Sequence, residues 1–188
     1  DTAVTLAKRD RNAMHFSGLV NAVLRKVAAE GKAKLAGIEP AVAPWLQGRW
    51  EKAHGTVVAR ELAAASLMQA PLDITVKSDP TLWAERLGGI ILPSGTVRLE
   101  GSHPPVEELE GFGDGAWWVQ DAASAIPAKL RNDIAGKPVL DLCAAPGGKT
   151  LQLAAMGADV TAVDASAPRL KRVSENLMRT NLSATVVC

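Results

Sequence analysis

Cysteine and histidine are scarce in this chain of 188 residues. The two cysteines, Cys143 and Cys188, are too few for a disulfide framework, and this sparse pattern suits reduced thiols in the cytosol. The three histidines, His15, His54 and His103, lack the spacing of a metal site. We therefore expect a cytoplasmic protein that binds no metal.

Long apolar runs and an amino-terminal targeting sequence are also lacking. No apolar segment approaches the roughly 20 residues that a membrane span needs, and no signal peptide is visible. A hydrophobic content of 47% and a charged content of 22% are those of an ordinary soluble protein. We expect a soluble monomer without a membrane partner.

The small net charge of +1 hides an asymmetry along the chain. Residues 1–60 contain ten Lys and Arg against five Asp and Glu, which gives +5, whereas residues 61–188 contain eleven against fifteen, which gives −4. A basic amino-terminal part favours a polyanion such as RNA, although solvated helix faces explain the charge equally well. The candidate RNA-binding residues are Arg9, Arg11, Arg25 and Lys26.

Helical periodicity dominates the first third of the chain. Apolar residues recur at helical spacing over residues 16–27 and predict an amphipathic helix that ends near Gly31. Two further helices are predicted over residues 40–52 and 56–68, with a break at Gly55 between them. The pattern indicates an all-helical domain.

The pattern changes after residue 70. Alternating residues over 72–76 and a turn-containing segment over 90–99 predict short strands, with a helix over 80–87 between them. These elements suggest a small α/β connector. A third part begins near Trp117, with a short strand and then a helix; the adjacent Gln120 and Asp121 fit a capping role and a site role about equally.

The most informative stretch of the sequence is 139–150. An apolar run ends in Asp141, a loop of small residues follows with Pro146, and a helix begins near Lys149. A second apolar run ends in Asp164, 23 positions after Asp141. A strand, a glycine-containing loop and a helix bring backbone close to a nucleotide-like ligand, and a carboxylate after the next strand accepts hydrogen bonds from ribose hydroxyls.

The stretch does not match either of two known phosphate-binding motifs. A Walker A loop needs a glycine where Cys143 stands, and a dinucleotide fingerprint needs more glycines than Gly147 and Gly148. The loop suits a cofactor with adenosine but no pyrophosphate, such as S-adenosylmethionine. A glycine-rich turn that only joins a strand to a helix is the simpler alternative, and Asp164 argues against it.

The candidate site divides into backbone donors and a few side chains. Backbone N–H groups at the start of the helix can receive the carboxylate of the cofactor's methionine part. Asp141 either meets the ammonium group or only orders the loop, Lys149 adds charge or points to solvent, and Arg169 braces Asp164 or lies on the surface. The predicted cofactor residues are Cys143, Ala144, Ala145, Pro146, Gly147, Gly148, Lys149 and Asp164.

Four segments resemble those of the bacterial Sun/NusB-type ribosomal RNA cytosine-5 methyltransferases. Residues 141–150 are similar to the family's cofactor motif, residues 117–124 to the element upstream of it, and residues 163–170 to its ribose-binding strand end. Residues 19–25 resemble a helix of the family's NusB-like RNA-binding domain. The resemblance implies a Rossmann-like S-adenosylmethionine-dependent methyltransferase domain, preceded by an all-α NusB-like domain and the α/β connector, that acts on ribosomal RNA.

The resemblance also implies which cysteines carry the chemistry. In this family a thiolate adds to carbon 6 of cytosine, so that carbon 5 can take the methyl group from the sulfonium. The family's cysteines lie in Pro-Cys and Thr-Cys motifs on later strands, and neither motif occurs here. Cys143 belongs to the cofactor loop and Cys188 follows no proline, so we assign no catalytic residue and expect the nucleophile beyond Cys188.

Both ends suggest a piece of a longer protein, because the chain starts without methionine and stops inside a predicted third strand. We expect residues 1–70 to form part of the NusB-like domain, residues 71–115 the connector, and residues 116–188 the first half of the methyltransferase domain. The runner-up is a NusB-like RNA-binding or transcription-related factor with a vestigial cofactor fold.

Overall fold

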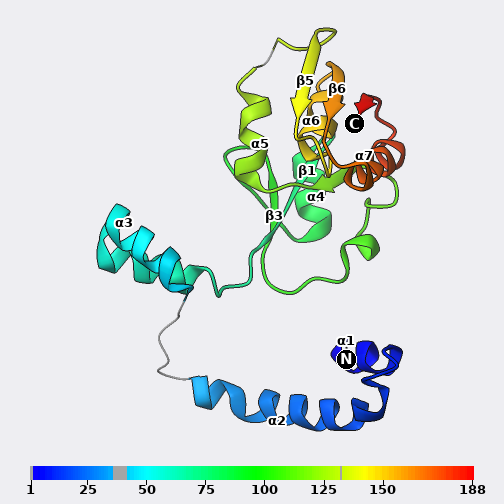
Figure 1. Cartoon of the computed structure of the whole chain (residues 1–188). Helices are drawn as coiled ribbons and strands as arrows, with labels where there is room; N and C mark the ends of the chain where they lie inside the picture. The colour runs from blue at the N-terminus through cyan, green and yellow to red at the C-terminus, as the bar shows by residue number, and fades with distance from the viewer. Residues whose placement is uncertain (1, 36–41, 132) are drawn as a thin grey trace. The chain divides into compact units, whose positions relative to one another are not determined.

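The chain forms two compact units, Asp1–Gln69 and Ala70–Cys188. The computed structural model describes residues 2–35, 42–131 and 133–188 (Figure 1). Among these residues, the first unit is entirely helical and the second contains all the strands. No helix in the described ranges is long and apolar enough to cross a membrane.

The helices of the first unit are α1 (Thr2–Arg9), the short 3₁₀ helix η1 (Met14–Phe16), α2 (Ser17–Leu35) and α3 (Pro44–Ala65). Gly55 has φ 82° and ψ 163° and kinks α3, where the sequence predicts a break. The predicted end at Gly31 is wrong, because α2 continues through it. One interior glycine costs a helix only about 1 kcal/mol, and good helix formers flank this one. The helix predicted from residue 40 begins at Pro44, and residues 40 and 41 lie outside the described residues.

The apolar stripe of α2 and η1 is exposed. Between 51% and 61% of the residue surface is accessible to solvent in Phe16, Leu19, Val23 and Val27. The short helix α1 contacts α2 and buries only Ala7. The first unit therefore has a much smaller core than the second.

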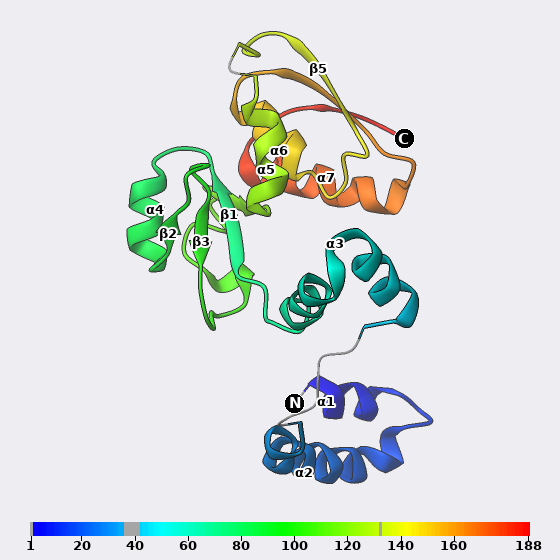
Figure 2. The same ribbon diagram turned by 90° about the vertical axis from the view of Figure 1, so that its left-hand side faces the viewer.

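The second unit begins with an antiparallel sheet of strand order β2-β3-β1-β4. The helix α4 packs against β2 and β3 (Figure 2), and Asp79 caps it by accepting a hydrogen bond from the Leu82 N–H. The core formed by this sheet and α4 contains Ile74, Val97 and Trp117. The elements are β1 (Leu72–Val76), α4 (Pro80–Leu87), β2 (Ile90–Ile91), β3 (Val97–Leu99), η2 (Val106–Glu108) and β4 (Trp117–Val119).

Strand β4 lies directly after the predicted boundary between the connector, 71–115, and the third part, 116–188. The strand pairs with β1, with Ile74 opposite Val119, and so completes the antiparallel sheet. Because successive side chains of a strand point to opposite faces, Trp117 enters the core of this sheet and Trp118 enters the core of the parallel sheet that follows. One short strand thus belongs to both cores, and the two parts form a single unit.

The parallel sheet has the strand order β5-β6-β7. Helices α6 and α7 pack on one face, where Ala162, Leu151 and Val173 lie in the core. On the other face the register places Leu142 beside Val163 and Val163 beside Val187, and Leu142 is 66% exposed. The elements are α5 (Ala122–Lys129), β5 (Pro138–Leu142), α6 (Gly148–Ala155), β6 (Asp159–Val163), α7 (Ala167–Thr180) and β7 (Thr185–Val187).

A buried carboxylate joins the antiparallel sheet to the start of α5, and its removal should destabilise the second unit. Asp73 accepts two hydrogen bonds from Arg98, at 2.7 and 2.8 Å, and a third from the Ala122 N–H at 3.0 Å. The bond to Arg98 holds the pKa of Asp73 below its ordinary value of 3.8. We expect Asp73→Asn to lower the free energy of unfolding by about 1–3 kcal/mol.

The stabilisation by Asp73 depends on pH. Because the pKa of Asp73 is depressed in the folded state, the stabilisation is present above pH 3.8 and is lost as the pH falls through the folded-state pKa. Urea unfolding at pH 7 and below pH 4 should therefore show a gap between the parent and Asp73→Asn that shrinks in acid. A gap that stays constant would mean that the carboxylate's charge is not what stabilises the unit.

Candidate functional site

The predicted cofactor loop lies at the carboxyl end of β5. Cys143 and Gly147 both have left-handed backbone, with φ of 61° and 111°, and the Ala145–Pro146 peptide is cis. The Ala144 N–H donates to the Val163 carbonyl at 3.0 Å, and the Gly147 N–H donates to the Ala144 carbonyl at 2.8 Å. The loop therefore turns back on itself and is tied to the end of the neighbouring strand β6.

Asp164 follows β6 and binds this loop directly. Its carboxylate is buried, and it accepts hydrogen bonds from the Ala145 N–H at 3.1 Å and from the Ser166 N–H at 3.0 Å. Arg169 lies 3.5 Å from the carboxylate and donates to the Ala145 carbonyl at 2.7 Å. The Ser166 and Ala145 N–H groups and the Arg169 charge hold the pKa of Asp164 below 3.8, although desolvation opposes them. Asp164 is thus an anion at neutral pH.

The other predicted side chains divide into buried and exposed ones. Asp141 is buried and accepts a hydrogen bond from the Thr150 hydroxyl at 2.6 Å, which links the end of β5 to the first turn of α6. Cys143, Pro146 and Lys149 are exposed. The structure therefore brings Asp164, Arg169 and the loop backbone together, whereas Asp141 is bonded to Thr150 of α6.

Backbone donors are available at the start of α6. The first N–H groups of a helix have no partner within the helix, and those of α6 begin at Gly148, directly after the turn at Gly147. An anionic group is stabilised at such a helix start by the N–H groups and by the helix dipole. The loop can therefore hold an anionic group close to the carboxylate of Asp164.

Three polar residues that support the loop were not assigned a role from the sequence. Asn176 on α7 donates to the Pro146 carbonyl at 3.1 Å, and Thr150 and Gln152 lie in the buried face of α6. Helical spacing places Asn176 in α7, but no local pattern pairs it with a residue thirty positions away. Only the folded chain shows this contact.

Gln120 has a structural role beneath the loop, and its neighbour Asp121 has a capping role. Gln120 accepts from the Trp118 indole N–H at 3.1 Å and donates to the Gln152 side chain at 2.9 Å. A β-carbon on Gly148 would lie 3.5 Å from the Gln120 side chain, so that the two are in contact range. Asp121 accepts from the Ser124 N–H at 3.1 Å and caps α5.

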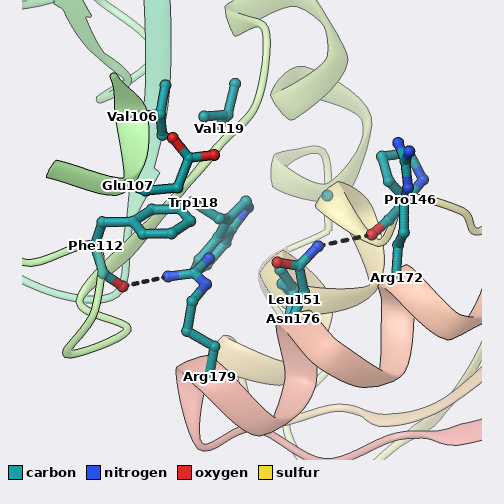
Figure 3. Close-up of a pocket in the computed structure, with 11 residues that line it drawn as sticks. Val106, Glu107, Phe112, Trp118, Val119, Pro146, Leu151, Arg172, Asn176 and Arg179 are labelled. Atoms are coloured by element: carbon teal, nitrogen blue, oxygen red, sulfur yellow. Dashed lines mark hydrogen bonds between the residues drawn. The ribbon is translucent and has the colours of Figure 1, made fainter. Parts of the chain in front are cut away.

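The described residues contain no group of three or more His, Cys, Asp or Glu side chains that could hold a metal ion. The loop does border a cavity of about 420 Å³, whose wall includes Pro146 and Gly148 (Figure 3). Asp164 does not line this cavity. The cavity therefore borders the loop at Pro146 and Gly148 and not at Asp164.

Comparison with known proteins places this loop in a family. Residues 129–188 match the family model of the 16S rRNA methyltransferase RsmB/F. Ribosomal RNA small subunit methyltransferase B of Pasteurella multocida is 34% identical over 191 residues, which cover 94% of this chain and 42% of that protein. The protein of the same name from Cronobacter sakazakii is 36% identical over 189 residues, which cover 92% of this chain and 44% of that protein. The chain is therefore similar to the RsmB/F methyltransferases along most of its length.

The RsmB/F match includes β5, β6, the whole loop and Asp164, whereas residues 1–128 lie outside the family model. The resemblance to the Sun/NusB-type methyltransferases is thereby confirmed at the level of the family. The chain spans less than half the length of these curated relatives.

Two solved structures share the fold of this chain. The crystal structure of PH0851 aligns with a TM-score of 0.68 and 22% identity over 76% of this chain and 35% of that chain. NSun6 from Pyrococcus horikoshii, crystallised with SFG, aligns with a TM-score of 0.67 and 15% identity over 79% of this chain and 65% of that chain. At these identities the likeness concerns the fold, which is mixed α/β with a parallel sheet.

Proposed function

We propose that this chain is the cofactor-binding part of a methyltransferase that transfers a methyl group from S-adenosylmethionine to carbon 5 of a cytosine in small-subunit ribosomal RNA. The observation that carries the proposal is the hydrogen bond from the Ala145 N–H to Asp164. It joins the glycine loop after β5 to the acid after β6, at the edge where parallel strands bind nucleotide-like ligands. The match of residues 129–188 to the RsmB/F methyltransferase model supports the same function. The vestigial RNA-binding factor is the weaker hypothesis, because the named relatives are methyltransferases.

The residues of the loop fit the cofactor. Each oxygen of Asp164 accepts one bond from the protein and so keeps a lone pair for a ribose hydroxyl. The N–H groups at Gly148 and Lys149 would receive the methionine carboxylate, and the adjacent glycines leave room for it. Arg169 contacts both Asp164 and the Ala145 carbonyl and so holds the carboxylate against the loop. When bound, S-adenosylmethionine supplies an electrophilic methyl group on its sulfonium.

We assign neither cysteine of this chain to catalysis. Cys143 is exposed but stands in the cofactor loop with a left-handed backbone, and Cys188 follows no proline. As the family resemblance implies, we propose that the thiolate that activates the cytosine lies outside these 188 residues. Activity of the whole protein would require that part together with this one.

Methyl transfer tests the proposed function and the cysteine assignment together. With labelled S-adenosylmethionine and small-subunit ribosomal RNA, the 188-residue chain should bind the cofactor but transfer no label. Labelled RNA would overturn the assignment of Cys143 and Cys188. Failure to bind the cofactor would overturn the proposed function itself.

The first unit is proposed to bind RNA without sequence preference, as the NusB-like resemblance implies. Arg9, Arg11, Arg25 and Lys26 are exposed on α1, α2 and the segment between them. Each phosphate contact releases counterion, so the log–log slope of affinity against salt should be about −0.7 per contact for single strands. We further expect the protein to act as a monomer in the cytoplasm.

Replacing Arg25 and Lys26 by alanine should reduce the magnitude of the salt slope by about 1.4, which is two contacts. The matched control is Arg131→Ala with Lys137→Ala, which removes two exposed charges that pair with Asp133 in the other unit. Filter binding of RNA over a series of salt concentrations measures both slopes. Equal slopes in the parent and the first double variant would make this face an ordinary solvated surface.

A further inference from the structure

The cavity beside the cofactor loop is lined by charged and apolar side chains. It lies within the Ala70–Cys188 unit, between η2, the segment that follows it and β4 on one side, and α6 and α7 on the other (Figure 3). Its volume of about 420 Å³ is in the range of small-molecule sites. Val106, Phe112, Val119 and Leu151 give it apolar walls.

One of the two arginines that line this cavity, Arg179, is held by contacts within the protein. Arg179 donates from Nη1 to the Phe112 carbonyl at 2.7 Å and to the Trp117 carbonyl at 3.1 Å, and its guanidinium lies 4.0 Å from the centre of the Phe112 ring. Its Nε is buried without a hydrogen-bond partner, and burial lowers the pKa of Arg179. Its positive charge nevertheless adds to the potential inside the cavity.

The second arginine is available to a ligand. Arg172 is exposed and stands one turn before Asn176 on α7. None of the ion pairs found among the described residues includes Arg172 or Arg179. The α7 side of the cavity therefore has positive charge that no carboxylate neutralises.

A single carboxylate stands on the other side of the cavity. Figure 3 shows Glu107 beside Val106 and Val119, across the cavity from Arg172. The cavity thus has the guanidinium of Arg172 at one end and the carboxylate of Glu107 at the other, and it is also lined by apolar side chains and by Arg179 on the Phe112 ring. A nucleotide has the matching sequence of groups: a phosphate, an apolar-faced ring and, in cytosine, adenine and guanine, an amino group that donates hydrogen bonds.

We propose that this cavity binds one nucleotide of single-stranded RNA, with its phosphate on Arg172 and the amino group of its base on Glu107. The proposal rests on the proposed function for its choice of RNA. Uracil presents a carbonyl oxygen where cytosine presents an amino group. The carboxylate of Glu107 therefore repels uridine, and the cavity selects amino-bearing bases.

Substitutions at Arg172 test the phosphate contact. Fluorescence anisotropy with short oligo(C) and oligo(U) RNAs should show that Arg172→Ala weakens both by a similar factor and reduces the magnitude of the salt slope by about 0.7. Lys171→Ala is the matched control, because Lys171 pairs with Glu175 on the same helix at 3.8 Å and does not line the cavity. An equal loss in Lys171→Ala would overturn the phosphate assignment.

Substitutions at Glu107 test the base contact. The parent should bind oligo(C) about threefold or more tightly than oligo(U), and Glu107→Gln should remove most of that preference, since an amide can also donate to the uracil carbonyl. Glu108→Gln removes the same charge from the adjacent exposed residue, which lies outside the cavity, and should strengthen both RNAs equally. A parent without preference, or the same change in both variants, would overturn the proposal.

Cofactor affinity separates this inference from the proposed function. All four variants should bind S-adenosylmethionine as the parent does, because none of the replaced residues belongs to the cofactor loop or contacts Asp164. Intact cofactor binding with no base preference would contradict the cavity proposal alone. Absent cofactor binding in the parent would contradict the proposed function, whatever the RNA preference.

Discussion

Replacing Gly115 by alanine is expected to destabilise the Ala70–Cys188 unit by about 3 kcal/mol or more, because two effects add at this position. Gly115 has φ 65°, a conformation that side chains disfavour, and a β-carbon there would lie 2.6 Å from the Thr180 Cα and closer still to the Arg179 carbonyl oxygen. The obstacle is the backbone at the end of α7, which cannot swing aside as a long side chain can.

Gly113→Ala is the matched control for this prediction. Gly113 lies in the same turn, but its backbone has no left-handed φ and a β-carbon would meet nothing within 4 Å. Urea unfolding followed by tryptophan fluorescence suits the comparison, since three of the five tryptophans, Trp83, Trp117 and Trp118, lie in this unit. Equal midpoints for the two variants would mean that the segment before β4 does not pack against α7 as described.

Replacing Asp164 by alanine is expected to lower the affinity for S-adenosylmethionine about tenfold or more, the scale of hydrogen bonds to a charged acceptor. The change removes the acceptor of the Ala145 and Ser166 N–H groups and leaves Arg169 without its carboxylate. Asp159→Ala is the matched control, because Asp159 is exposed at the opposite end of the same strand β6. It should bind the cofactor as the parent does.

The protonation of Asp164 sets the pH range of this effect. Its pKa is held below 3.8, so the carboxylate stays ionised from neutral pH down to about pH 4. The contribution of Asp164 to cofactor affinity should therefore be constant over that range and fall only in stronger acid. Calorimetric titrations at several pH values measure this dependence, and a loss of the Asp164 contribution near pH 6 would contradict it.

The elements around the loop could be predicted from sequence because their causes are local. Helix α4 spans residues 80–87 as predicted, and β5 and β6 end at Leu142 and Val163, within a residue of the predicted ends of the apolar runs at Asp141 and Asp164. Apolar runs, caps and glycines act over a few residues, and these are the patterns that a sequence displays.

The features that could not be predicted from the sequence depend on contacts between distant segments of the chain. Strand β4 has three residues, and nothing in them shows that they pair with β1 more than forty positions earlier. The same holds for Arg179, whose carbonyl partners at Phe112 and Trp117 are 67 and 62 positions away. At the candidate site, the sequence predicted the loop and Asp164, but their mutual bond and the contact of Asn176 with Pro146 required the fold.

One calorimetric cycle tests most directly whether Asp164 holds the ribose of the cofactor. S-adenosylmethionine and an analogue that lacks the ribose 2′-hydroxyl would each be titrated into the parent and into Asp164→Ala. If Asp164 accepts a bond from that hydroxyl, removing the hydroxyl weakens binding to the parent but changes little in the variant, because the partner is already gone. A loss of the same size in both proteins would show that Asp164 only braces the loop, and failure of the parent to bind S-adenosylmethionine would contradict the cofactor site altogether.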